Sequence, residues 1–222
     1  MNGEKTNPLL SVLGAKLRLL GDLLAVNLLW IVCSVPIVTI GAASSAAYAV
    51  LLRRVMKGEI PVFRTWCKSF RENFLQALAM EGILALIGVA LWADVQMVFA
   101  FSGGIRWAYA GACAVLALLF LAVALFALPQ QALFRNSLKN ILKNGFALAF
   151  CYPAKFLLCC LFWAVSVGLL LLLPWELVDR IGFFWLMWGL SGPAWFTSRV
   201  LISIFSGLTP DVKESEDNDH ES

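Results

Sequence analysis

Long uncharged apolar runs alternate with short charged segments along the whole chain. No Asp, Glu, Lys or Arg falls between Asp22 and Arg53, and residues 107–134 are likewise uncharged. A helix of about 20 apolar residues is long enough to cross the roughly 30 Å hydrocarbon core of a bilayer. The pattern predicts five long spanning helices, over residues 19–40, 76–101, 107–134, 156–175 and 181–205.

A helix break is predicted inside the first apolar stretch. Pro36 lacks a backbone N–H and disfavours helical geometry at Val35, and Gly41 follows five residues later. The helix expected after the break, residues 42–56, is short for a full crossing at a rise of about 1.5 Å per residue. The sequence leaves open whether this short helix crosses.

Two amphipathic segments, at residues 63–75 and from residue 135 to Pro153, are typical of helices that lie on a membrane surface. In each, basic residues recur at helical spacing opposite apolar ones. We expect these faces to bind anionic lipid headgroups or a cytoplasmic partner. They comprise Arg64, Lys68 and Arg71 in the first segment, and Arg135, Lys139 and Lys143 in the second.

The expected fold class is therefore all-α: a polytopic helical membrane bundle with five long spans, one short helix and two interfacial helices. Residues 1–209 form a single membrane domain, and residues 210–222, acidic and free of aromatic residues, form a disordered cytoplasmic tail. If the short helix crosses, both termini are cytoplasmic, and all of the 17 Lys and Arg residues except Arg106 and Arg180 lie inside. If it does not cross, the charges of the N-terminal segment move outside.

Composition supports the membrane assignment and removes several functions. The chain is 61% hydrophobic and only 14% charged, with a mean hydropathy of +0.83, too apolar for a soluble domain of this size. The net charge of +3 gives no support for nucleic-acid binding. The single histidine, His220, is in the tail, and the six cysteines show no metal-ligand spacing. Nucleotide-binding, metalloprotease and serine-hydrolase motifs are absent, so we expect no metal, no cofactor and no enzymatic activity.

Polar residues at membrane depth are candidates for function because their burial is costly. Glu81 and Arg199 lie at matched depths in two predicted spans, so we expect an ion pair that either clasps two helices or forms part of a proton or substrate relay. A second candidate surrounds the break, because transporters use broken helices to bind ligands. Alternatively, these polar groups only bond to neighbouring helices. The residues at the break are Asn27, Ser34, Pro36, Thr39, Gly41 and Ser44.

The segment Asn-Leu-Leu-Trp…Pro-Ile-Val-Thr-Ile-Gly, which begins at Asn27, and the later segment Phe70-Arg-Glu-Asn-Phe74 closely resemble the bacterial YesL family over about residues 10–205. That family comprises uncharacterised multi-pass membrane proteins, often encoded beside carbohydrate uptake transporters and polysaccharide-degrading enzymes. The resemblance implies the bacterial cytoplasmic membrane as location and supplies no catalytic or binding residue.

Two functions remain open from the sequence. The first is an accessory or regulatory partner in carbohydrate uptake, bound to membrane subunits of an ABC transporter or a sensor. The second is a small-molecule permease with its site at Pro36. The oligomeric state is undetermined.

Overall fold

The computed structural model describes residues 8–134, 136–172 and 174–208 of the chain. These residues form helices and connecting turns, with no strand among them. In order, the elements are α1 (Pro8–Cys33), the 3-10 helix η1 (Ile37–Thr39), α2 (Ile40–Lys57), α3 (Val62–Val98), α4 (Gly103–Leu133), α5 (Leu138–Cys151), α6 (Pro153–Leu172), α7 (Trp175–Trp188) and α8 (Ser191–Leu208). The expectation of an all-α fold is confirmed for the described residues.

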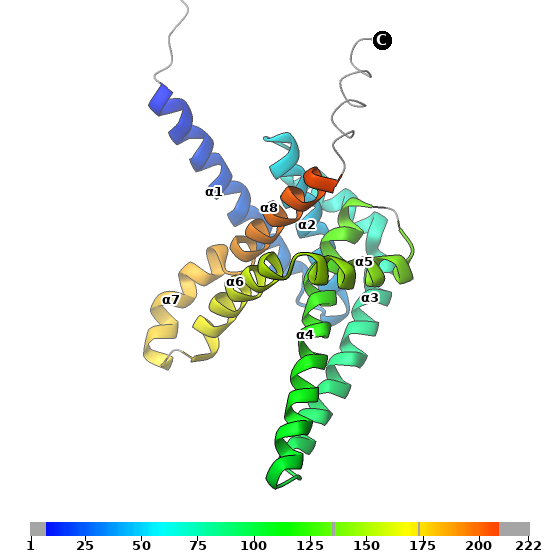
Figure 1. The fold of residues 1–222 in the computed structure, drawn as a ribbon. Coiled ribbons are helices and arrows are strands. Elements are labelled where there is room, and N and C mark those ends of the chain that lie inside the picture. The colour runs from blue at the N-terminus through cyan, green and yellow to red at the C-terminus, as the bar shows by residue number, and fades with distance from the viewer. Residues whose placement is uncertain (1–7, 135, 173, 209–222) are drawn as a thin grey trace, which may run out of the picture.

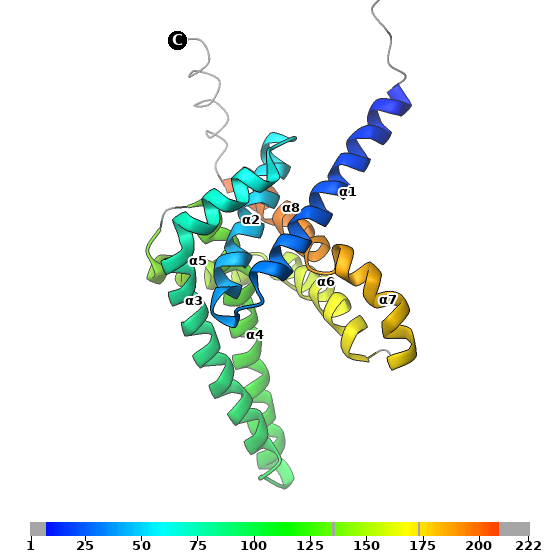
Figure 2. The same cartoon turned by 180° about the vertical axis from the view of Figure 1, so that it is seen from behind.

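Two antiparallel hairpins extend from a central group of helices (Figure 1). The longer hairpin is α3–α4, and the shorter is α6–α7; the views from the front and from behind show both (Figures 1 and 2). The beginning of α1, the end of α2 and the end of α8 all point away from the tip of α3–α4. These three helix ends therefore lie at one end of the molecule, and the α3–α4 turn lies at the opposite end.

The helix break predicted around Pro36 is confirmed. Helix α1 ends at Cys33, and helical structure resumes with η1 and then with α2 at Ile40. The cause is local, because Pro36 takes an extended ψ of 114° and has no N–H to continue the α1 hydrogen-bond ladder.

Helix α2 is the centre of the packed core. Every residue from Gly41 to Leu52 is buried, and the helix contacts α1, α3, α4 and α8. Its first half is rich in Ala and Ser, whose small side chains let neighbouring backbones approach closely. The short helix predicted at residues 42–56 is therefore the element against which most of the others pack.

The two amphipathic segments are both helical, but they join their spans differently. The first is continuous with its span, as α3 runs unbroken from Val62 to Val98. The second, α5, is separated from α6 at Pro153 by a bend of 103°. Between α3 and α4 the chain turns tightly at Gly103, whose φ of +64° suits a residue without a Cβ.

Two described helices, α3 and α4, are long and apolar enough to cross a membrane, and a third crossing results if α5 and α6 count as one bent span. The five predicted spans are not confirmed. Helix α1 carries Lys16, Arg18 and Asp22, so its uncharged part, from residue 23 to Cys33, is short. At about 1.5 Å per residue, the 14-residue α7 is also too short to cross.

The predictions for the C-terminal region are wrong in two places. Residues 181–205 are not one span, because they divide between α7 and α8, and residues 176–180, which fall between two of the predicted spans, are helical and belong to α7. Helix α6 ends at Leu172 and α7 begins at Trp175, directly after Pro174, whose φ of −56° suits the start of a helix. The break at Gly189 has a packing cause: the indole of Trp185 lies where a Cβ of residue 189 would stand.

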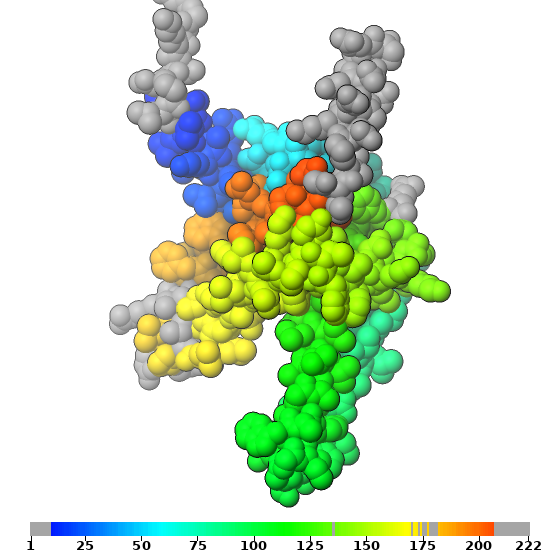
Figure 3. Space-filling view, viewed as in Figure 1, coloured from blue at the N-terminus to red at the C-terminus, as the bar shows by residue number. Residues whose placement is uncertain are grey.

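The α3–α4 hairpin exposes apolar side chains on both of its helices. The exposed side chains include Leu86, Val89 and Trp92 on α3 and Val115 and Leu118 on α4. In the space-filling view its tip stands clear of the remaining helices (Figure 3). An apolar surface of this extent is stable in a hydrocarbon environment and costly in water.

Candidate functional site

The carboxylate of Glu81 caps the broken helix. Its Oε2 atom accepts a hydrogen bond of 2.9 Å from the backbone N–H of Gly41, in the first turn of α2. The first N–H groups of a helix have no partner within the helix, and the positive end of its dipole favours an anion. The first turn of α2 contains no acidic residue, so the carboxylate comes from α3.

The contact requires a glycine at position 41. A Cβ placed there would lie 2.8 Å from the carbonyl oxygen of Ala77 and 2.9 Å from Cβ of Glu81. Both atoms are held by the α3 backbone and cannot move away independently. Gly41 therefore lets the N-terminus of α2 rest directly on α3, within reach of the carboxylate.

Other polar groups at the break are bonded mainly within it. The hydroxyl of Thr39 donates to the carbonyl oxygens of Cys33 at 2.6 Å and Pro36 at 2.7 Å. Ser34 Oγ is buried without a hydrogen-bond partner. The tip carries exposed apolar side chains, Val35 and Ile37 among them. The break thus offers an apolar tip to its surroundings and bonds most of its polar groups internally.

Asn27 stabilises a second helix break, far away in sequence. Its side chain is fully buried, and its Oδ1 accepts 2.9 Å hydrogen bonds from the N–H groups of Leu190 and Ser191 at the start of α8. Its Nδ2 donates to the carbonyl oxygen of Leu186 at 2.7 Å, at the end of α7. One amide therefore satisfies both sides of the α7–α8 break.

Ser44 belongs to the aromatic part of the core. Its hydroxyl accepts a 3.1 Å hydrogen bond from Nε1 of Trp30. The Trp30 ring makes edge contacts with Tyr48 and with Trp163, at centroid distances of 6.0 and 6.3 Å. Ser44 thus links α1 to α2 and has no role at the break.

The structure does not assemble the predicted site as one cluster. Asn27 and Ser44 bond away from the break, while Thr39 and Gly41 remain at it. The expected Glu81–Arg199 pair is not among the ion pairs of the described side chains, which include Arg18–Glu59 and Arg54–Asp22. Glu81 bonds instead to the Gly41 N–H, and Arg199 is exposed on α8. Matched depth alone does not bring two groups together, because each can lie on any side of its helix.

Sequence reasoning missed the second break. The signal was present, because Gly189 is followed by Ser191-Gly-Pro193, residues typical of turns and helix starts. It was weak because Gly and Pro are common within membrane helices. The buried Asn27, rather than the local sequence, completes the break.

The predicted basic faces are exposed. Arg64, Lys68 and Arg71 lie exposed on the first part of α3, and Lys139 and Lys143 lie exposed on α5. Arg135 lies outside the described residues, as does the predicted acidic tail of residues 210–222. Lipid or partner binding by these faces stays a prediction.

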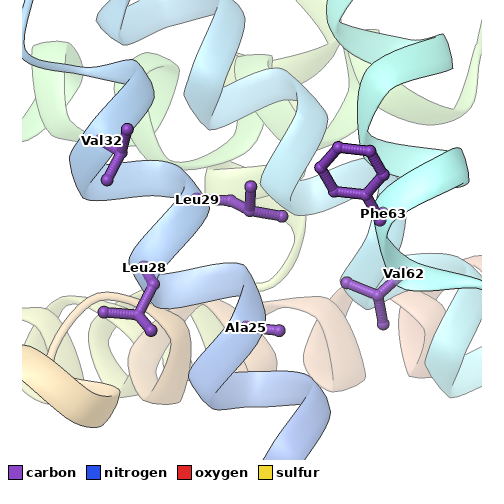
Figure 4. A pocket seen from close by; sticks show the side chains of 6 residues that line it. All are labelled: Ala25, Leu28, Leu29, Val32, Val62 and Phe63. Carbon is purple, nitrogen blue, oxygen red and sulfur yellow. The ribbon is translucent and has the colours of Figure 1, made fainter.

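An apolar groove separates α1 from the start of α3 (Figure 4). Its volume is about 380 Å³, and Ala25, Leu28, Leu29 and Val32 of α1 face Val62 and Phe63 of α3 across it. None of these side chains has a hydrogen-bonding group, so the groove suits a hydrocarbon chain and cannot select a polar solute. The described residues also contain no group of three His, Cys, Asp or Glu side chains that could hold a metal ion.

Together, these features define an all-helical chain, with two described helices apolar enough to cross a membrane, whose helix breaks are closed by its own polar side chains. A comparison with protein families matches residues 23–95 to a family described as a protein of unknown function, DUF624. Comparisons with curated proteins and with solved structures give no match. The matched region contains Asn27, Gly41 and Glu81, and so includes the cap of α2.

Proposed function

We propose that this protein is a non-enzymatic component of the bacterial cytoplasmic membrane that acts by binding another membrane protein. The observation that carries the proposal is the closure of the Pro36 break by the protein's own groups. The N–H of Gly41 is bonded to Glu81, and the Asn27 amide is occupied at the α7–α8 break. A permease site at Pro36 would need such groups free for a solute.

The exposed apolar surface of the α3–α4 hairpin supports a partner role. Both helices extend beyond the central group (Figure 1). The most apolar 18-residue window of each is only 11% buried in α3 and 22% buried in α4. Such a surface can bind lipid, and it can equally pack against spanning helices of another protein.

The identity of the partner rests on resemblance. The similarity to the YesL family favours a membrane subunit of a carbohydrate uptake transporter, such as an ABC transporter, or of a sensor. In the same proposal both termini are cytoplasmic, and the exposed basic faces of α3 and α5 contact anionic headgroups at that surface. The common direction of the α1 start, the α2 end and the α8 end supports this orientation.

Site-specific crosslinking in native membranes tests the partner role. A photoreactive residue at Val89 or Leu118, on the exposed hairpin, is expected to crosslink a transporter or sensor subunit. The same probe at Leu161, equally apolar and exposed on α6, is the matched control and is expected to crosslink only lipid. Crosslinking only to lipid at all three positions would count against the partner role.

Reconstitution tests the permease alternative. The purified protein alone in liposomes is expected to give no flux of mono- or oligosaccharides. Flux that is lost when Glu81 is replaced by Ala would support the permease and overturn the proposal.

A further inference from the structure

A second pocket, of about 550 Å³, lies where the end of α4 meets α5 and the end of α8. Neither this pocket nor the groove beside α1 is lined by a charged side chain, but only this pocket is lined by amides, of which it has three. We call it the amide pocket. Its amides belong to Gln130, Asn136 and Asn144, and its apolar lining includes Phe134, Ala147 and Phe205.

The Gln130 amide is buried and lacks a partner for its N–H groups. Gln130 is only 4% exposed, and its Nε2 atom has no hydrogen-bond partner. It lies close to α5, 3.7 Å from where a Cβ of Gly145 would stand. Buried N–H groups are nearly always bonded, so this donor indicates an acceptor supplied from outside the chain.

The depth of the pocket matches a headgroup region. At the far end of α4 the hydroxyl of Tyr109 bonds to Asp94 at 3.2 Å, near the turn between α3 and α4. About 32 Å of helix separates Tyr109 from Gln130, close to the roughly 30 Å thickness of a hydrocarbon core. If the polar groups around Tyr109 lie at one surface, Gln130 lies at the headgroups of the opposite leaflet.

Two lysines of α5 are close in sequence to its pocket residues, although neither lines the pocket. Lys143 is adjacent to Asn144 and four residues before Ala147, and Lys139 lies about one turn earlier. Both lysines are exposed, and long lysine side chains can extend along a helix surface. Positive charge is therefore available beside a pocket whose lining holds neutral donors, an arrangement suited to a phosphate group.

We propose that the amide pocket binds the headgroup of an anionic glycerophospholipid from the cytoplasmic leaflet. Gln130 and Asn144 donate to its phosphate oxygens, Lys139 and Lys143 neutralise its charge, and Phe134 and Phe205 contact the first part of its acyl chains. The inference rests on the membrane placement in the proposed function and is independent of the protein partner.

Native mass spectrometry of the full chain in detergent tests this site. The probes are phosphatidylglycerol and phosphatidylcholine with identical acyl chains, and glycerol phosphate as a soluble competitor. The wild type is expected to retain phosphatidylglycerol at least about tenfold more tightly than phosphatidylcholine, and glycerol phosphate is expected not to compete.

Three variants and a control make the test specific. Gln130→Leu and Asn144→Leu are each expected to weaken phosphatidylglycerol binding about tenfold. Asn144 is exposed, so Asn144→Leu tests the site even if Gln130→Leu disturbs folding. The double variant Lys139→Gln with Lys143→Gln is expected to remove the preference between the two lipids. Gln96→Leu, the same chemical change on exposed α3 near the other end, is expected to leave binding unchanged.

The results that would overturn the site are distinct from failure of the partner role. Equal retention of both lipids by the wild type would overturn it, as would unchanged binding in both Leu variants. Competition by glycerol phosphate would indicate a soluble phosphate ligand and would overturn the lipid assignment. If the hairpin crosslinks a partner while neither lipid is retained, the pocket proposal fails and the proposed function stands.

Discussion

Replacement of Gly41 by Ala tests the contact between α2 and α3 most directly. The added Cβ would lie 2.8 Å from the carbonyl oxygen of Ala77 and 3.1 Å from Oε2 of Glu81. Helix α2 would have to move off α3, and the 2.9 Å hydrogen bond to the Gly41 N–H would lengthen. Overpacking of this kind costs about 1–3 kcal/mol, and the greater helix propensity of Ala returns up to about 1 kcal/mol. We expect a net destabilisation of about 1–2 kcal/mol.

Gly82→Ala provides the matched control. Gly82 is adjacent to Glu81 on α3, but a Cβ placed there would meet no atom within 4 Å. The substitution is therefore expected to be neutral or to stabilise the protein by up to about 1 kcal/mol. The two variants share the same chemical change and differ only in the space around it.

The assay is unfolding in detergent micelles, by heat and by titration with sodium dodecyl sulfate, followed by tryptophan fluorescence. The reasoning is refuted if Gly41→Ala is as stable as the wild type, or if both glycine variants change stability equally. Glu81→Gln separates charge from geometry: the amide oxygen can still accept the bond, so only the interaction with the α2 dipole, about 0.5–2 kcal/mol, is expected to be lost.

Three further predictions are tested by the same unfolding assay. Asn27→Leu leaves two N–H groups and one carbonyl oxygen without their side-chain partner, so the free energy of unfolding is expected to fall by at least about 3 kcal/mol. Asn27→Asp keeps the acceptor and should lower it less. Equal decreases in the two variants would contradict this explanation. Gly189→Ala should destabilise the α7–α8 break, because the added Cβ would overlap the indole ring of Trp185. Gly192→Ala is the control and should not destabilise it, because a Cβ there meets no atom within 4 Å. If Gly189→Ala is tolerated, the indole is not fixed in that position. Asp22→Asn and Arg54→Gln each remove one partner of a 2.7 Å ion pair, in which the Asp22 side chain is 27% exposed and that of Arg54 is 10% exposed. A double-mutant cycle should give a coupling energy of about 1 kcal/mol. Full additivity of the two stability changes would show that the pair contributes nothing.

The two helix breaks share one physical solution. Each leaves backbone groups unpaired at a helix end, and each is completed by a polar side chain from another helix, Glu81 for α2 and Asn27 for α8. Water cannot satisfy such groups in a hydrocarbon environment, so the side chain must. This explains why an ionisable residue and a fully buried amide occur in apolar helices although the described residues hold no group of three potential metal ligands.

The sequence by itself determined the elements whose signals are local. The long apolar runs predicted a helical, membrane-like chain and the helices α3 and α4, and Pro36 predicted the first break. Helical spacing of basic and apolar residues identified the segments that became the first part of α3 and all of α5. These features depend only on hydropathy and backbone geometry within a few helical turns, so they can be predicted from a single sequence.

Only the tertiary structure decided what the buried polar groups bond to. Glu81 bonds to Gly41 and not to Arg199, and Asn27 bonds to residues more than 150 positions away. Depth in a membrane restricts such partners without selecting one, because side chains at equal depth can point in any direction around their helices. The division of residues 181–205 into α7 and α8 has the same origin, since Asn27 of α1 and Ser166 of α6 bond to the backbone at the break, and the indole of Trp185 occupies the space beside Gly189.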